Sequence, residues 1–309
     1  MSSLHYLLTE YCEPLPTCSI QPYKVESGSW GVQTRTHKLP GVRGRTPLSV
    51  TLTFPNEWSG PIPTFVLSPG LGAHPTANRY LERHLASHGY LVARPSHRGS
   101  DWIAVATRTP LGAFTRSELG HRVREMESVI FALESGELGF LPAEGQMALG
   151  GHSFGALTAC VLAGLPAEGL ELQRESYSAQ ALVALSPYGD SFPTRSMGID
   201  PDGFSELSHP VLFMSGTRDE LFTLGKGSKT HLEPFKISGA QEKRHVVVGK
   251  TRHGSFSEIF GWVRKETRVM VNSSVAAFLD THLLDNPESR EYLETGLALA
   301  AFEYESWAF

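Results

Sequence analysis

A glycine-rich pentapeptide, GHSFG, occupies residues 151–155 between two apolar segments. The preceding segment 146–150 (QMALG) is typical of a short buried strand, and the following segment 156–163 (ALTACVLA) has the composition of a buried helix. A strand, a G-x-S-x-G sequence and a helix, in this order, are the context of a nucleophile elbow, in which a tight turn exposes the serine hydroxyl. Ser153 is therefore the candidate nucleophile, although the motif alone also occurs by chance in glycine-rich chains.

Polar residues follow three other predicted strands. Asp219 comes after the apolar run 211–214, His253 comes after 246–248, and the turn 68–73 (SPGLGA) comes after 64–67. Because active groups in open parallel sheets lie beyond the carboxyl ends of the strands, we expect these groups to meet Ser153. The chain order Ser, Asp, His is that of the α/β-hydrolases.

These residue types suit nucleophilic catalysis. His253 takes the proton of Ser153, since a neutral hydroxyl is a poor nucleophile, and Asp219 fixes the imidazole tautomer. The backbone N–H groups of Phe154 and Leu71 are the expected donors of an oxyanion hole. Asp190, after the run 181–185, is the competing acid.

Short apolar runs alternate with helical patterns along the chain. Residues 32–36 and 48–54 alternate apolar with polar and predict paired antiparallel strands, which form one edge of the sheet. Strands are expected at 64–67, 90–93, 181–185, 211–214 and 245–248, and helices at 78–87, 117–133 and about 257–284. This pattern predicts an α/β-hydrolase fold, with a mostly parallel central sheet and helices on both faces.

The domain boundaries follow from composition. We expect an irregular N-terminal segment at 1–22, one α/β-hydrolase domain at 23–285 and a C-terminal tail at 286–309. The segment 188–209 is rich in Gly, Pro, Ser and Asp and is a candidate lid, or alternatively a connection whose aromatic side chains cap the core. The aromatic tail is expected to pack on the body, and a homodimer is a further possibility.

Charge and composition exclude several classes of protein. The 309 residues are 40% apolar and 19% charged with a net charge of -5, which indicates a globular protein without general affinity for nucleic acid. The segment 79–124 holds eight arginines, no lysine and three acidic residues. Arg98 and Arg108 could bind an anionic group of a substrate, but ordinary ion pairing with the acidic remainder is the favoured interpretation.

No cofactor or metal is expected, because the chain contains no HExxH motif, no zinc-type cysteine and histidine spacing and no glycine-rich nucleotide-binding motif. The three cysteines, Cys12, Cys18 and Cys160, are expected to be free thiols. The sequence has no pattern of a signal peptide or a membrane-spanning segment, so a cytoplasmic location is expected.

Substrate-binding residues are expected in the loops above the strand ends. His74, Arg98, Trp102 and Tyr188 are the candidates, and the expected partner is a small-molecule ester.

Several segments resemble a known family. The sequences FVLSPGLGA at 65–73, LASHGYLVA at 85–93 and His97-Arg98, together with GHSFG, resemble the platelet-activating factor acetylhydrolase family. They are also similar to predicted dienelactone hydrolases and, more distantly, to cutinase-like polyester hydrolases. The resemblance covers most of the chain, residues 45–280. It implies that Ser153 is the nucleophile and His253 the base, that the N–H groups of Leu71 and Phe154 form the oxyanion hole, and that ester hydrolysis proceeds without metal through an acyl-enzyme.

The chain departs from that family at the acid. The acetylhydrolases place it after the strand that follows the elbow helix, where residues 185–188 read LSPY and Asp190 is the first carboxylate. Asp219 instead matches the placement in dienelactone hydrolases and cutinases, but dienelactone hydrolases proper use a cysteine nucleophile.

The sequence thus predicts a serine carboxylesterase for a small or medium acyl group. A thioesterase, an amidase or an acyltransferase with the same acyl-enzyme is the alternative, and an inactive hydrolase fold used for binding is a third interpretation.

Overall fold

The structure is a computed structural model, which describes residues 21–44, 46–99, 101–107, 110–172, 179–220, 227–258, 263–298 and 307–308. Cys12, Cys18, Arg108 and residues 299–306 and 309 of the tail therefore lie outside the described residues.

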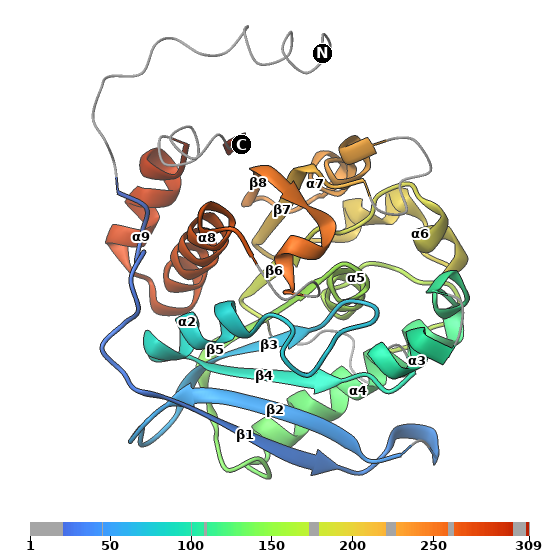
Figure 1. Ribbon diagram of the computed structural model, residues 1–309, viewed down its shortest axis with the longest axis horizontal. Helices are drawn as coiled ribbons and strands as arrows, with labels where there is room; N and C mark the ends of the chain where they lie inside the picture. Colours follow the sequence, from blue (N-terminus) through green and yellow to red (C-terminus); the bar gives the residue numbers. More distant parts are fainter. Residues whose placement is uncertain are drawn as a thin grey trace, which may run out of the picture.

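A twisted sheet runs through the molecule (Figure 1). The described residues form nine strands in the order β1-β2-β4-β3-β5-β6-β7-β8-β9. All neighbours from β4 to β8 are parallel, whereas β1, β2 and β9 pair antiparallel with their neighbours. The strands are β1 (Val32–Leu39), β2 (Leu48–Pro55), β3 (Ile62–Ser68), β4 (Leu91–Ser96), β5 (Pro142–His152), β6 (Ala181–Leu185), β7 (Val211–Arg218), β8 (Lys243–Arg252) and β9 (Trp307–Ala308).

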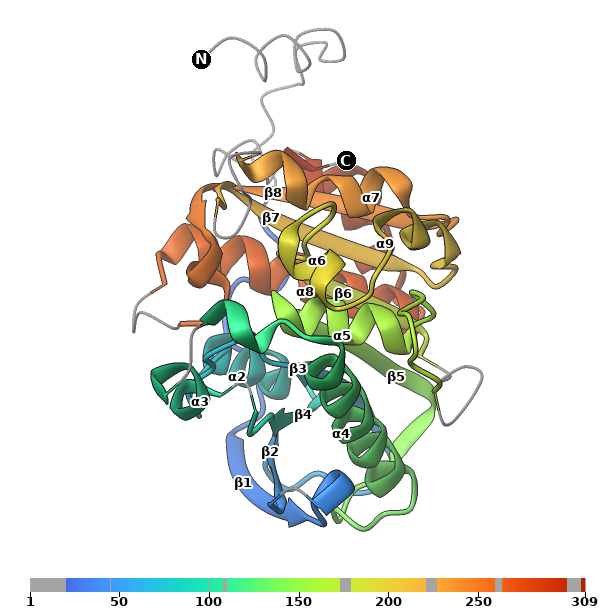
Figure 2. The same ribbon diagram turned by 90° about the vertical axis from the view of Figure 1, so that its right-hand side faces the viewer.

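Helices cover both faces of this sheet (Figures 1 and 2). One face carries α2 (Arg79–Ser87) and α8 (Lys265–Leu284), and the other carries α4 (Arg116–Glu134) and α5 (Phe154–Leu162). Each face of the sheet needs this cover because it is apolar. In strand β3, for example, successive apolar side chains point to opposite faces. Phe65 and Leu67 belong to the apolar core on the side of α2 and α8, whereas Val66 belongs to the core on the side of α4 and α5.

Shorter helices lie in the connections. They are α3 (Trp102–Thr107), α6 (Phe192–Ser196), α7 (Glu233–Ile237), α9 (Pro287–Glu291), a π-helical turn (Tyr292–Gly296) and 3-10 turns at Val42–Gly44, Pro110–Ala113, Pro201–Glu206, Gly227–His231 and His253–Phe256. Among the described residues, no helix is both long enough and apolar enough to cross a membrane.

The predicted fold class, α/β with a mostly parallel sheet and an antiparallel N-terminal edge, is confirmed. Two details differ from prediction. The last long helix starts at Lys265 rather than near residue 257, because His253–Phe256 forms a 3-10 turn and Glu258 has a left-handed φ of 56°. A second antiparallel edge also exists, since Trp307 in β9 pairs with Val247 in β8.

The candidate lid packs on the body. Met197 and Phe204 from the segment 188–209 are fully buried in the core beside α5, while Phe192 is exposed. Met197 and Phe204 thus belong to the core beside α5. The start of the tail also packs, because the ring of Tyr292 lies 5.7 Å from that of Tyr23.

Candidate active site

Ser153 sits on a sharp turn between β5 and α5. Its backbone has φ 57° and ψ −120°, a conformation that residues other than glycine rarely adopt. Both flanking positions must be glycine, because a Cβ atom there would clash with the neighbouring backbone. A Cβ on Gly151 would lie 2.2 Å from the carbonyl carbon of Gly155, and a Cβ on Gly155 would lie 2.0 Å from the backbone oxygen of Ser68. The GHSFG sequence therefore makes the strained turn that the sequence pattern predicts.

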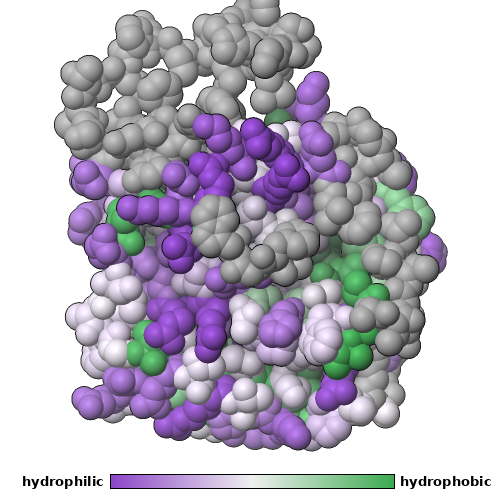
Figure 3. Space-filling view, in the orientation of Figure 1, coloured by the Kyte–Doolittle hydropathy of each residue, from purple (hydrophilic) through white to green (hydrophobic). Residues whose placement is uncertain are grey.

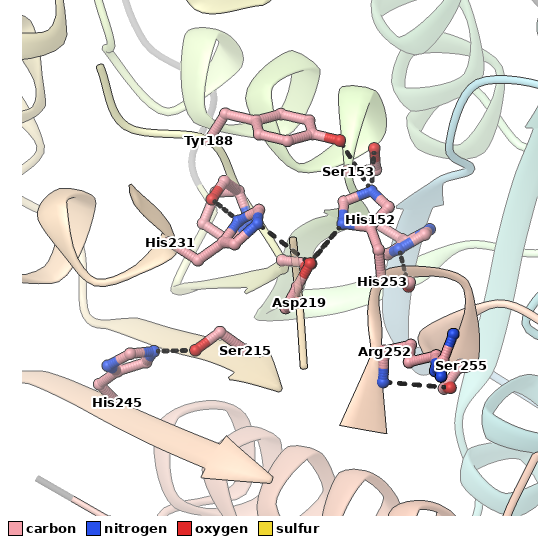
Figure 4. A network of polar contacts seen from close by, with 12 residues as sticks. His152, Ser153, Tyr188, Ser215, Asp219, His231, His245, Arg252, His253 and Ser255 are labelled. Carbon is pink, nitrogen blue, oxygen red and sulfur yellow. Dashed lines mark hydrogen bonds and ion pairs between the residues drawn. The ribbon is translucent and has the colours of Figure 1, made fainter. Parts of the chain in front are cut away.

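Three side chains from different strand ends meet at this turn (Figure 4). Oγ of Ser153 lies 2.7 Å from Nε2 of His253, and Nδ1 of His253 lies 2.7 Å from Oδ1 of Asp219. The hydroxyl can donate to Nε2 while Nδ1–H donates to the carboxylate, which is the tautomer that a general base needs. The structure thus brings together all three residues that the sequence predicts as a catalytic group.

Asp219 is buried and has several polar partners. Ser186 Oγ donates to its Oδ2, and Nε2 of His231 lies 3.0 Å from its Oδ1. Burial alone raises the pKa of this carboxyl, but the two imidazoles of His253 and His231 outweigh burial and hold the pKa well below its usual range. Asp219 is therefore ionised at neutral pH and able to accept from His253.

His231 is a site residue that sequence reasoning missed. It lies at the end of the 3-10 turn Gly227–His231, and its Nδ1 donates to the carbonyl oxygen of Pro187 at 2.7 Å. The side chain is fully buried. Nothing in its local sequence distinguishes it from the other twelve histidines. Asp219 and His231 lie in the same connection between β7 and β8, and the path of that connection brings them together.

Tyr188 belongs to the same cluster. The sequence predicts that Tyr188 binds substrate, and its hydroxyl lies 3.0 Å from Nε2 of His253. Its ring stacks on the imidazole, with centroids 5.2 Å apart and the planes inclined by 27°. Burial raises the pKa of the phenol far above its ordinary value, so Tyr188 keeps its proton. Two hydroxyls, those of Ser153 and Tyr188, thus lie beside the same imidazole nitrogen.

His152 supports the loop that carries His253. Its Nε2 donates to the backbone oxygen of His253 at 3.0 Å. Burial lowers the pKa of His152 to about 3, so the ring is neutral at physiological pH. His152, which precedes Ser153, therefore ties the turn of Ser153 to the loop that carries His253.

The glycine-rich turn 68–73 lies directly against the elbow. Ser68 at the end of β3 pairs with Gly151, and a Cβ on Gly70 would lie 2.8 Å from Nδ1 of His152. Leu71 follows in this turn, and Phe154 is the first residue of α5. The two expected oxyanion donors thus come from segments in mutual contact.

Asp190 lies apart from the histidine cluster. Its Oδ1 is 2.5 Å from Nε of Arg195, at the exposed start of α6. The geometry favours Asp219 over Asp190 as the partner of His253. His97, also considered from the sequence as a pocket residue, is buried, with Nδ1 2.6 Å from Glu125 and Nε2 3.0 Å from Ser68 Oγ.

The remaining substrate candidates lie at the surface. His74 and Trp102 are exposed with ring centroids 6.0 Å apart, and Arg98 is exposed in the loop after β4. Figure 3 shows apolar groups in green toward its right-hand side, where Figure 1 draws α3 and α6. The exposed apolar side chains there include Ile103 and Phe192.

Other arginines of the segment 79–124 form ion pairs. Arg94 pairs with Glu82 in the interior, within the same segment, and Arg116 pairs with Glu168 at the surface. For Arg98 and Arg108 ion pairing stays a prediction, and Arg108 lies outside the described residues.

One group of side chains among the described residues has metal-ligating types close together. The donor atoms of Asp219, His231 and His253 all lie within 4.8 Å of one another. The contacts of 2.7 and 3.0 Å to Asp219 are closer than the separation of about 3.3 Å that ligands adopt around zinc at its usual bond lengths. The spacing thus suits proton sharing better than a common ion.

Comparison of the sequence with models of known families finds no match, and comparison with curated proteins finds none either.

Proposed function

We propose that the protein is a serine hydrolase of the α/β-hydrolase type, which cleaves carboxylic esters of small or medium acyl groups through an acyl-enzyme. The observation that carries this proposal is the chain of two 2.7 Å contacts from Ser153 through His253 to Asp219. The strained backbone of Ser153 is a second support, because unfavourable φ/ψ angles cluster at functional sites.

In the proposed first step, Oγ of Ser153 attacks the ester carbonyl while Nε2 of His253 takes the hydroxyl proton. The carbonyl oxygen becomes an oxyanion, which the N–H groups of Leu71 and Phe154 stabilise. Collapse of the tetrahedral intermediate expels the alcohol, which leaves with the proton from His253. The result is an acyl group on Ser153 and a neutral imidazole.

In the second step, water attacks the acyl carbon and gives its proton to the same nitrogen. A second oxyanion forms and collapses, the carboxylic acid leaves, and the proton returns to Ser153 Oγ. Throughout, Asp219 stays ionised and stabilises the imidazolium, in keeping with the direction of its pKa shift.

The crowding around Ser153 supports a limited acyl size. Phe154 and Tyr188, which lie beside Ser153, are fully buried. The buried ring of Phe114 lies 5.3 Å from that of Phe154 and 6.5 Å from that of Tyr188. Large aromatic side chains in contact leave little room for a long chain on that side.

A panel of p-nitrophenyl esters with acyl chains of increasing length tests the proposal, with Ser153→Ala as the matched control. We expect hydrolysis that is fastest for short chains and that Ser153→Ala reduces by at least about a thousandfold. Equal rates for the wild type and the variant would refute the proposed function.

A further inference from the structure

A buried arginine lies behind the elbow. Arg122 in α4 has no exposed surface, and it is the largest fully buried side chain among the described residues. A buried guanidinium is expensive unless its donors are satisfied. Its contacts therefore show what it holds in place.

The first set of contacts leads to the turn after β3. Nη2 of Arg122 donates to the backbone oxygen of Pro69 and lies 3.2 Å from Oγ of Ser68. The Ser68 hydroxyl is also 3.0 Å from Nε2 of His97, whose other nitrogen is 2.6 Å from Glu125. Arg122 and the His97–Glu125 pair thus both hold the residues just before Leu71.

The second set of contacts leads to the first turns of α5. Nε of Arg122 lies 3.3 Å from Oγ of Thr158, and the guanidinium carbon lies 4.3 Å from the centre of the Phe154 ring. Thr158 in turn donates to the backbone oxygen of Phe154 at 2.9 Å. A cation over an aromatic face is attractive and favours one ring orientation.

One side chain therefore bridges the two segments that supply the proposed oxyanion donors. The two segments also touch each other directly, because the backbone oxygen of Ser68 lies 2.0 Å from the position that a Cβ on Gly155 would occupy. A shift of Pro69 moves Leu71, and a shift of α5 moves Phe154. Oxyanion donors act only within about 2.7–3.1 Å of the developing charge, so their separation matters for catalysis.

The guanidinium of Arg122 is charged in this buried position. Burial lowers its pKa to about 10, while Glu118 and Glu125 act in the opposite direction, so the guanidinium remains charged at neutral pH. A neutral side chain of similar shape would keep the packing but lose the forked donors that reach Pro69 and Thr158 together.

We propose that Arg122 is a positioning residue that fixes the two halves of the oxyanion hole relative to each other. This inference rests on the proposed function, since an oxyanion hole has a role only if Ser153 forms tetrahedral intermediates. It assigns a role to one arginine of the segment 79–124 that differs from surface ion pairing or from contact with substrate.

The test compares Arg122→Lys, Arg122→Gln and Thr158→Val with Arg124→Gln, a matched control on the same helix whose side chain contacts Glu127. The readouts are kcat and KM on p-nitrophenyl acetate, inhibition by a short alkylboronic acid that mimics the tetrahedral intermediate, and thermal melting. Thr158→Val keeps the branched shape and removes only the hydroxyl, and it keeps the inference testable if the arginine variants do not fold.

We expect Arg122→Gln to lower kcat by about 30-fold or more with KM changed less than threefold, and the inhibition constant of the boronic acid to rise in parallel. Arg122→Lys should recover part of the loss, and Thr158→Val should lower kcat several-fold. Arg124→Gln should match the wild type.

The inference is overturned if folded Arg122 variants and Thr158→Val keep the wild-type kcat and boronic acid affinity, or if kcat falls without any change in that affinity. If the arginine variants do not fold, the result for Thr158→Val decides. A wild-type protein without esterase activity that fails to react at Ser153 is a different outcome, because it removes the proposed function itself.

Discussion

Oδ1 of Asp219 lies 2.7 Å from Nδ1 of His253, although 33 residues separate them in the chain. Both side chains are almost completely withdrawn from solvent. A charge-assisted hydrogen bond in such a place holds the imidazole in one tautomer and one orientation.

We predict that Asp219→Asn lowers kcat by at least about a hundredfold, because an amide at this position favours the wrong imidazole tautomer. The matched variant Asp190→Asn should retain nearly full activity, since Asp190 contacts Arg195 instead. Ester hydrolysis by the two purified variants provides the measurement. A large loss for Asp190→Asn with little for Asp219→Asn would move the acid to the acetylhydrolase position.

His231 is expected to orient the same carboxylate. Its Nε2 lies 3.0 Å from Oδ1 of Asp219, and its Nδ1 is held by Pro187. We predict that His231→Ala lowers kcat by about tenfold to a hundredfold, and that His231→Gln, which keeps an N–H donor, recovers most of it. Steady-state kinetics on both variants, with melting temperatures as a check of folding, would decide. Equal kcat values in His231→Ala and wild type would remove His231 from the site.

The strained backbone of Ser153 predicts a difference in stability between two substitutions of this residue. Ser153→Gly and Ser153→Ala both lose the hydroxyl, but only glycine reaches φ 57° and ψ −120° without strain. We therefore expect Ser153→Gly to be more stable than Ser153→Ala by about 1 kcal/mol, measured by denaturant unfolding. The opposite order would show that the elbow stores no strain at Ser153.

Buried histidines should make the fold sensitive to acid. Burial lowers the pKa of His84 to about 4 and the pKa values of His152 and His245 to about 3. The unfolded chain therefore binds more protons below the unperturbed pKa of about 6.5, and stability declines as the pH falls below that value. Each such histidine costs about 2 kcal/mol at pH 5, from about 1.4 kcal/mol per pH unit.

His245 allows a test outside the cluster of Ser153, Asp219 and His253, since its Nε2 lies 2.9 Å from Oγ of Ser215. His245→Gln should lose less stability than the wild type between pH 7 and pH 5 when denaturant unfolding is measured at both. The exposed His74→Gln serves as the control and should follow the wild type. Parallel losses in all three proteins would contradict the assigned cause.

Much of this architecture follows from local patterns. Short apolar runs predict the buried strands. The turn at Ser153 is predicted because GHSFG stands between such a run and a helical segment. Ser153, Asp219 and His253 were predictable because each follows a strand in a parallel sheet, and such ends gather at one edge.

The rest depends on contacts between distant segments. Arg122 reaches Pro69 and Thr158 only through tertiary packing that no local spacing encodes. His231 reaches Asp219 through the path of the irregular connection between β7 and β8, which no apolar pattern predicts. The start of the last long helix was misplaced because residue 258 adopts a left-handed turn despite being a glutamate, which usually favours helices. The antiparallel pairing of Trp307 with Val247 could not be predicted either, since β9 has only two residues and shows no strand pattern.

The proposed function requires Ser153 to be an activated nucleophile. The decisive measurement is reaction of the folded 309-residue chain with a fluorophosphonate probe, followed by mass spectrometry of the labelled peptide. We expect one covalent adduct on Ser153, its loss in Ser153→Ala, and slower labelling in Asp219→Asn. A folded wild-type protein whose Ser153 remains unlabelled would refute the proposed function.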